Sequence, residues 1–239
     1  MTTRKIRVIT GMQDVTIAID NKILGSRFLR QVASEVGVTD TGWLGLQYSD
    51  LKGRWWWIKD HKKVLGQKVR PTVDPIIMFL KVRLYPPRPS QITDTTMQRL
   101  VYLQIQAALQ VGELICPAPR DSTLAALARQ DSVLQYLETA EDLEEYGMWH
   151  FLVTRQNDAT PVRLSFNTTG FIVTVSNRKC EFPFSELKGI KMNGRKLILF
   201  HTSKAFTDSV FLCLDHAHTK ELYELAVRHQ KFYLTKNAC

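Results

Sequence analysis

The sequence predicts an α+β fold built from three consecutive parts. Alternating apolar and polar residues with one helical stretch occupy residues 1–85, helical periodicity occupies residues 90–147, and alternation returns over residues 148–235. The proline-rich segment Tyr85–Pro89 separates the first two parts, because prolines favour extended backbone and block helix formation. These ranges are the three predicted domains.

The first part is predicted to hold five strands and one helix. The strands are residues 5–10, 15–20, 44–48, 54–58 and 76–83. Gly11 and Asp14 lie between the first two, which predicts a hairpin. Ser26 is expected to cap a helix with a 3.6-residue apolar period, and Gly37 is expected to end it. The order strand, strand, helix, strands is that of a ubiquitin-like fold.

Three consecutive tryptophans lie in the fourth predicted strand. Because side chains alternate between the faces of a strand, Trp55 and Trp57 are expected to pack in a core and Trp56 to lie on the other face. The alternative interpretation is insertion into a membrane, and Trp56 alone could lie at an interface.

The second part is predicted to be helical over residues 96–109, 124–129 and 132–146. Ser122 is expected to cap the second helix, and Gly147 to end the third. The acidic residues of the third helix are expected to form a solvated face.

The third part is predicted to contain seven strands followed by one helix. The strands are residues 150–155, 162–166, 171–175, 180–184, 189–192, 196–200 and 209–214. The helix covers residues 219–233. This order is that of a pleckstrin-homology or phosphotyrosine-binding (PH/PTB) fold.

The formal net charge of +9 favours an anionic partner, which could be nucleic acid, an acidic lipid surface or an acidic peptide. The alternative is a basic surface with no such partner. The sequence has no run of about 18 apolar residues, no secretory signal, and no myristoylation or prenylation motif. We therefore expect any contact with a membrane to be made from the cytosol without a lipid anchor. Cys180 and Cys213 lie in apolar strands and are expected to be core residues.

The three-part order and several local strings together resemble a FERM domain. Similar to the first lobe of the ezrin, radixin and merlin group are Trp43–Tyr48, Trp57–Lys59 and Lys62–Val64. Similar to the two ends of the middle lobe are Gln98–Gln104 and Ala140–Gly147. Similar to the third lobe of the band 4.1 relatives are Phe182–Phe184 and Glu224–His229. The middle lobe is about half as long as the resemblance leads us to expect. The implied fold is a ubiquitin-like lobe, a shortened helical bundle and a PH/PTB-like sandwich with a C-terminal helix.

The resemblance implies a binding site for phosphoinositide headgroups. The matching positions are Lys59, Lys62, Lys63, Arg195, Lys196 and Lys204. Several cations must converge on a polyphosphate, because each contact near an anionic surface contributes only about 1 kcal/mol. The alternative is a set of unconnected surface cations. Asp215, His216 and His218 precede the last helix, where a polar helix cap is favoured over a metal site.

A second site is expected where an extended peptide adds to a strand edge beside the last helix. Its candidate residues are Ile190, Met192, Leu222, Ala226 and His229. The alternative is that these residues are core, above all Leu222 and Ala226.

The resemblance implies a non-enzymatic adaptor with no cofactor, located in the cytoplasm and peripherally at the inner plasma membrane and cell cortex. Its expected partners are cytoplasmic tails of membrane proteins, acidic membrane lipids, and cytoskeletal or scaffold proteins. The sequence has no Cys-x5-Arg, GxSxG, HExxH or glycine-rich phosphate loop. The alternatives are a regulatory FERM fragment or splice form of a larger signalling protein, such as a kinase or phosphatase, and a nucleic-acid-binding protein. No nucleic acid is expected as a partner, because no RNP, zinc-finger or helix-turn-helix pattern occurs.

Overall fold

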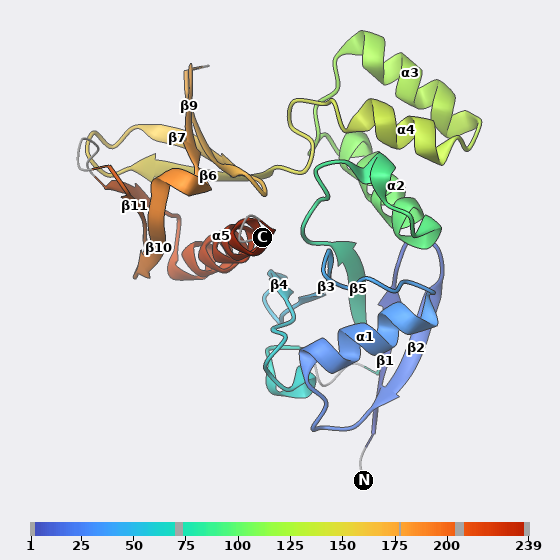
Figure 1. The fold of residues 1–239 in the computed structure, drawn as a ribbon. Helices are drawn as coiled ribbons and strands as arrows, with labels where there is room; N and C mark the ends of the chain where they lie inside the picture. Colours follow the sequence, from blue (N-terminus) through green and yellow to red (C-terminus); the bar gives the residue numbers. More distant parts are fainter. Residues whose placement is uncertain (1–2, 70–73, 177, 204–207, 237–239) are drawn as a thin grey trace. The chain divides into compact units, whose positions relative to one another are not determined.

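A computed structural model describes residues 3–69, 74–176, 178–203 and 208–236. The chain divides into two compact units, Met1–Tyr146 and Gly147–Cys239 (Figure 1). The first unit contains a mixed sheet with one helix packed on it, followed by three helices. The second contains an antiparallel sheet and a long C-terminal helix. The predicted α+β class, with ubiquitin-like, helical and PH-like parts, is confirmed.

The ubiquitin-like lobe is built on a five-stranded sheet in the order β2-β1-β5-β3-β4. Its strands are β1 (Arg4–Ile9), β2 (Asp14–Ile19), β3 (Leu44–Ser49), β4 (Trp55–Trp57) and β5 (Ile76–Val82). Strands β1 and β5 run parallel, and the other neighbours are antiparallel. Alternate residues of β1 and β5 face inward, where Ile6, Val8 and Met78 are fully buried with Phe28 and Val32 of helix α1 (Gly25–Glu35).

Helix α1 does not begin with the predicted serine cap. Its N-cap is Leu24, with no side-chain hydrogen bond, and Ser26 already lies in the first turn. The backbone N–H of Ser26 instead donates to the Asp60 carbonyl (2.9 Å), so a neighbouring loop satisfies the helix end. At the other end, Gly37 adopts φ +80°, as a helix-terminating glycine requires.

The three tryptophans alternate between the faces of the sheet, but the faces are reversed from the prediction: Trp56 lies opposite the core residue Tyr48, and Trp55 and Trp57 lie on the other face. Trp57 is 6% exposed, and its ring lies against Gly45, where an added Cβ would come within 2.7 Å of it. Trp56 packs against the core and donates its indole N–H to the Asp50 carboxylate (2.8 Å). Trp55 is 47% exposed because it begins the edge strand of the sheet, and its ring contacts Phe79 edge to face. The prediction is therefore wrong for Trp55, which is exposed, and for Trp56, which packs against the core; Trp57 is buried, but on the face opposite that core.

Three helices follow the sheet: α2 (Thr95–Gln110), α3 (Ala118–Arg129) and α4 (Val133–Ala140). Ser122 is not a cap, since α3 begins four residues earlier and the Ser122 hydroxyl donates to the Ala118 carbonyl (3.2 Å). Helix α4 ends at Ala140 rather than Tyr146, because the following turns bury Leu143 and bring the Tyr146 hydroxyl to the Pro86 carbonyl (2.9 Å).

The helices and the sheet of the first unit share one hydrophobic core. Gln104 of α2 pairs with the end of β5: its Oε1 accepts from the Val82 N–H (2.7 Å) and its Nε2 donates to the Val82 carbonyl (2.9 Å). Asp94 caps α2 by accepting from the Met97 N–H (2.9 Å), and it also accepts from the Thr39 N–H (3.1 Å). These bonds tie the helices to the ubiquitin-like lobe.

The second unit is a seven-stranded sheet in the order β10-β11-β12-β6-β7-β8-β9. Its elements are β6 (Trp149–Arg155), β7 (Pro161–Phe166), β8 (Gly170–Val175), β9 (Arg178–Pro183), β10 (Leu187–Asn193), β11 (Lys196–His201), β12 (Ser209–Leu212) and α5 (His216–Lys236). Short 3-10 turns occur at Val64–Gly66, Pro89–Gln91 and Phe184–Glu186. Cys213 is buried as predicted, but Cys180 is exposed because β9 is an edge strand.

Helix α5 begins three residues earlier than predicted. Its start is capped by Asp215, whose carboxylate accepts from the His218 N–H (2.8 Å). This geometry is that of the expected polar cap. In the part of the chain that the structure describes, no helix is both long enough and apolar enough to cross a membrane.

Candidate functional site

The loop that carries the predicted lysines of the first lobe is fastened to the start of α1. The Gly25 N–H donates to the Lys62 carbonyl (2.9 Å), and the Lys62 N–H donates to the Lys59 carbonyl (3.2 Å). Lys63 forms an isolated β-bridge with Leu24. The backbone of the loop is therefore fixed where three cationic side chains leave it.

Two residues that sequence reasoning missed make this attachment possible. At Gly25, an added Cβ would lie 2.4 Å from the Lys59 carbonyl oxygen, so only glycine permits this close approach. Gln67 accepts from the Lys59 N–H at its Oε1 (2.8 Å), and its Nε2 donates to the Lys59 and Lys63 carbonyls (both 3.3 Å). A glycine before a helix and a nearby glutamine are too common in sequences to have signalled this role.

The side chains of Lys62 and Lys63 are exposed, and that of Lys59 is half-buried. The surrounding lobe is strongly basic: residues 1–85 contain 15 Lys and Arg against 7 Asp and Glu, a formal +8. The structure thus gathers the three predicted lysines on one rigid loop of a cationic lobe. Such a loop can present converging ammonium groups to a multiply charged anion.

The predicted cations of the second unit lie at the β10–β11 hairpin. Arg195 and Lys196 are exposed, and Gly194 occupies the turn with φ +59°. The Arg195 Nε donates to the Cys213 carbonyl (3.0 Å), which fixes the turn beside the start of α5. Lys204 lies outside the described residues. The two groups of cations belong to different units of the chain.

The predicted peptide surface is the edge of β10, and the structure divides its five residues into two groups. Ile190 and Met192 are half-buried and pair with Leu199 and Leu197, whose side chains are fully buried. Among the described strands, β10 pairs only with β11, so its other edge is open to an added strand. Helix α5 packs against β10 (Figure 1).

The other three predicted peptide residues are fully buried in the lobe. Leu222, Ala226 and His229 have no exposed surface, and the Nδ1–H of His229 donates to the Leu225 carbonyl (2.8 Å). These side chains support α5 from within, and a docked peptide would reach them only if α5 moved. The structure therefore places these three predicted peptide contacts in the core of the lobe, and Ile190 and Met192 remain the accessible candidates.

Charges around the β10 edge favour an acidic ligand. Lys188 and Lys191 are exposed on β10. On α5, burial and then the nearby Glu224 raise the pKa of Glu221 to about 7.

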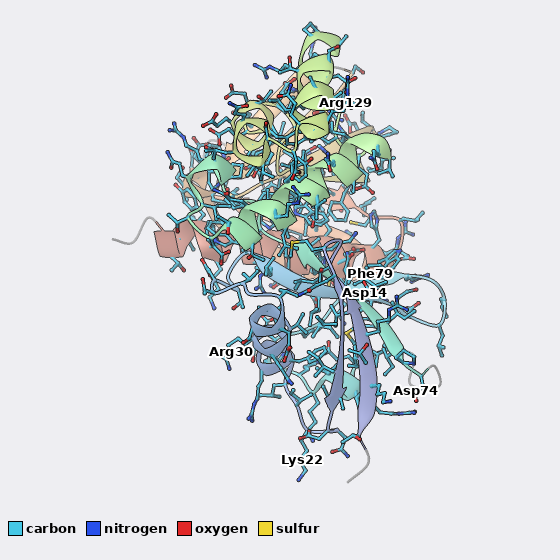
Figure 2. The ribbon with its side chains drawn as sticks, turned by 90° about the vertical axis from the view of Figure 1, so that its right-hand side faces the viewer. Asp14, Lys22, Arg30, Asp74, Phe79 and Arg129 are labelled. Carbon is cyan, nitrogen blue, oxygen red and sulfur yellow. The ribbon has the colours of Figure 1, made fainter. Side chains whose placement is uncertain are left out.

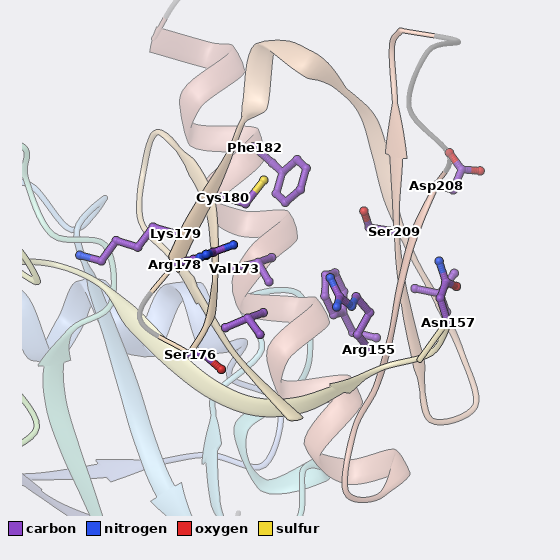
Figure 3. A pocket seen from close by; sticks show the side chains of 13 residues that line it. Arg155, Asn157, Val173, Ser176, Arg178, Lys179, Cys180, Phe182, Asp208 and Ser209 are labelled. Carbon is purple, nitrogen blue, oxygen red and sulfur yellow. The ribbon is translucent and has the colours of Figure 1, made fainter. Parts of the chain in front are cut away.

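A hollow of about 690 Å³ lies elsewhere in the second unit. Figure 3 shows that its lining comes from β8 and β9 on one side and from β12 and the β6–β7 turn on the other. The lining includes the buried Val173 and Phe211, the half-buried Arg155 and the exposed Arg178. Arg155 is paired with Asp158 through its Nε (3.0 Å), and this hydrogen bond holds the pKa of Asp158 well below its usual range. No residue of the predicted lipid or peptide site lies here, because the lining comes from separate hairpins with no shared motif.

Comparison with known proteins decides the family. Residues 12–70 match the FERM N-terminal domain, and residues 156–238 match the FERM C-terminal PH-like domain. The chain carries a FERM domain. The match to two "Moesin/ezrin/radixin homolog 1" proteins extends over nearly the whole chain: that of Culex quinquefasciatus is 26% identical over 291 residues and 97% of this chain, and that of Aedes aegypti is 26% identical over the same lengths.

The chain spans about half the length of the curated relatives it matches, 50% and 49% respectively. The matched span of 291 positions exceeds the 239 residues of this chain, so the relatives have segments within the match that this FERM domain lacks. The helical lobe is accordingly shortened, as the sequence predicts.

Solved structures show the same fold. The Drosophila Merlin structure, a complex of FERM and C-terminal domain, superposes with a TM-score of 0.89 at 17% identity, covering 98% of both chains. The Dictyostelium discoideum myosin VII MyTH4-FERM MF2 domain superposes with a TM-score of 0.69 at 11% identity, covering 98% of this chain and 60% of the other. At these identities the likeness establishes the fold of this FERM domain.

Proposed function

We propose that this FERM domain is a non-enzymatic adaptor that holds an anionic membrane surface and the cytoplasmic tail of a membrane protein. It works in the cytoplasm, peripherally at the inner plasma membrane and cell cortex, where cytoskeletal or scaffold proteins are further partners. The observation that carries the proposal is the loop of Lys59, Lys62 and Lys63, fixed against the start of α1 in a lobe of formal charge +8.

The rigid lysine loop supports a contact with phosphoinositides. A headgroup with several phosphates gains from cations carried on a backbone that is already ordered, because less loop entropy is lost on binding. The exposed Arg195 and Lys196 supply a second cationic surface on the other unit. Kinship with the moesin, ezrin and radixin homologues supports the same role.

The open edge of β10 supports the second half of the proposal. An extended tail can pair with the edge through its backbone and place one aromatic or aliphatic side chain against Ile190 and Met192. Lys188 and Lys191 would favour acidic tails and speed their association.

The lipid half is tested by sedimenting the protein with vesicles. The probes are phosphatidylcholine alone, phosphatidylcholine with phosphatidylserine, and phosphatidylcholine with phosphatidylinositol 4,5-bisphosphate at matched surface charge. The proposal expects binding only to anionic vesicles, strongest with the bisphosphate. No binding at low salt would refute it, whereas a salt-dependent shift of a DNA or RNA duplex instead would favour the nucleic-acid alternative.

The peptide half is tested with Ile190→Asp. A charge in the groove should weaken the binding of synthetic acidic tail peptides at least about tenfold, because an unpaired charge is costly to bury. Leu152→Asp, at a position 78% exposed in the same unit, is the matched control. Circular dichroism and thermal melting show whether either variant has unfolded. Full peptide affinity in a folded Ile190→Asp protein would place the tail elsewhere.

A further inference from the structure

The β3–β4 hairpin of the ubiquitin-like lobe displays an apolar tip. Leu51, in the turn, is 74% exposed, and Trp55, at the start of β4, is 47% exposed. Trp55 contacts Phe79 with ring centroids 5.3 Å apart, and Ile77, on the same face of β5, is 45% exposed. Single exposed apolar residues are common on soluble proteins, but Trp55, Phe79 and Ile77 share one face of the sheet, and Leu51 lies in the turn that leads into β4. Such a group is typical of a surface that contacts another molecule.

This face lies on the side of the sheet away from α1. Figure 2 shows Arg30 of α1 on one side of the strands and Phe79 on the other. The inward residues of β5, such as Met78, are buried, so Ile77 and Phe79 point outward by strand alternation.

The turn is held in one shape by Asp50. Its Oδ1 accepts from the Lys52 N–H (2.8 Å) and the Arg54 N–H (3.0 Å), and its Oδ2 accepts from the Trp56 indole N–H (2.8 Å). The Asp50 N–H donates to the Arg54 carbonyl (2.9 Å), and Gly53 takes φ +76°. The tip is therefore preorganised to present Leu51.

The same bonds turn the negative charge of the hairpin inward. Asp50 is buried, while Lys52 and Arg54 are exposed on either side of Gly53. The outer face of the strands adds three cations against one acid: it carries Lys5, Arg7, Lys81 and Asp14. An apolar tip set among cations complements a surface that is anionic outside and apolar beneath.

We propose that Leu51 and Trp55 insert into an anionic bilayer at the level of the headgroups, with Lys52 and Arg54 on the lipid phosphates. The inference rests on the proposed membrane contact and adds an insertion element to it, separate from the lysine loop. A tryptophan fits this place because its ring is apolar while its indole N–H can remain hydrogen-bonded at the interface. A bilayer fits better than an acidic protein, since a projecting turn needs no matching pocket in a fluid surface.

The first test compares Leu51→Ser with Leu152→Ser, a control that removes an equally exposed leucine from the second unit. On vesicles of phosphatidylcholine with phosphatidylserine, Leu51→Ser is expected to weaken binding roughly five- to tenfold, as loss of one inserted side chain should. The control should bind like the wild type. Because insertion is apolar, the fold-change should be the same at about 0.1 M and about 1 M salt, where charge effects are largely screened.

The second test follows the tryptophan itself. Vesicles with brominated acyl chains should quench the fluorescence of the wild-type protein more than that of Trp55→Phe, which keeps an aromatic ring beside Phe79. Equal quenching of the wild type and Trp55→Phe would overturn the proposed insertion. So would vesicle binding by Leu51→Ser that equals that of the wild type. Either result would leave the proposed function standing, provided that the wild type binds the vesicles. If the wild type binds no anionic vesicle, the proposed function fails too. Loss of binding to an acidic protein with no change on vesicles would assign the tip to a protein partner and refute the inference.

Discussion

The ubiquitin-like lobe and the short helical lobe share one core but differ in packing and in charge. In the ubiquitin-like lobe, helix α1 packs four residues into the core, among them Phe28 and Val32 with no exposed surface. In α3, all of whose 12 residues are described, Leu124 is the one buried side chain. Residues 1–85 carry a formal +8, whereas residues 90–147, with 3 Lys and Arg against 9 Asp and Glu, carry −6.

This contrast distinguishes the lobe whose role is structural from the lobe whose charge suits it to bind an anionic ligand. The shortened lobe keeps α2, which pairs with β5 through Gln104 and is capped by Asp94 against Thr39. It retains few cations and offers an acidic surface that would repel an anionic membrane. We infer that it serves as a connection, while the basic lobe makes the membrane contact.

The largest expected effect on stability compares a core substitution in the ubiquitin-like lobe with one in the helical lobe. Phe28→Ala should lower the free energy of unfolding by about 3–5 kcal/mol, because it leaves a cavity in a tightly packed core. Leu124→Ala should instead release α3 locally, with a smaller shift of the main urea transition. Equal shifts in the two variants would contradict the difference in packing.

Limited proteolysis should expose the same difference in the wild-type protein. Because α3 buries one side chain, the first cuts are expected between Pro117 and Asp131, while the PH-like unit survives. Mass spectrometry of early fragments locates the cuts. Uniform resistance along the chain would mean that the short lobe is packed as firmly as its neighbours.

Asp94 offers a smaller, pH-dependent test of the link between the lobes. Burial raises the pKa of its carboxyl, but the hydrogen bonds from Met97 and Thr39 outweigh burial and hold the pKa below its ordinary value of 3.8. Its contribution to stability is therefore present above pH 3.8 and is lost as the pH falls through the lower folded pKa. Asp94→Ala should cost about 1 kcal/mol at pH 7. The difference in free energy of unfolding between wild type and Asp94→Ala, measured with urea, should become smaller as the pH falls into the acid range. A difference that stays constant with pH would show that the ionised carboxylate is not what stabilises the link.

The smallest effect is expected at the ion pair between Arg99 and Asp131, which joins α2 to the end of α3. The Asp131 side chain is 66% exposed and that of Arg99 is 36% exposed, so the pair should contribute less than about 0.5 kcal/mol. Asp131 has φ +53°, a conformation that asparagine also tolerates. Asp131→Asn should therefore leave the unfolding midpoint almost unchanged, and a large loss would show that α3 is held more strongly than its burial implies.

Much of the fold followed from the sequence because local patterns determined it. Strand alternation in β1 and β5, the helical period of α1 and the glycine at its end reflect short-range physics. The errors arose where distant residues intervened. Ser26 lost its capping role to the Asp60 carbonyl, and Trp55 stayed exposed because nothing in the strand pattern marks the edge of a sheet.

The candidate site was predicted less completely than the fold. Family resemblance located the lysines, but the close approach at Gly25 and the three bonds of Gln67 depend on a loop folding back on a helix. Burial of Leu222, Ala226 and His229 likewise depends on how α5 lies on its sheet. Helical periodicity marks these residues as one face and does not say whether that face is covered.

The central claim is that the lysine loop, and not the net charge, binds the membrane. It is tested most directly by sedimenting two charge-matched triple variants with vesicles that contain phosphatidylinositol 4,5-bisphosphate. One changes Lys59, Lys62 and Lys63 to Gln, and the other changes the exposed Arg30, Arg120 and Arg129 to Gln. We expect the lysine variant to lose at least about tenfold in affinity at low salt and less at high salt, since screening already removes long-range attraction, and the arginine variant to stay close to wild type. Equal losses in the two variants would show that total charge alone drives binding and would contradict the account.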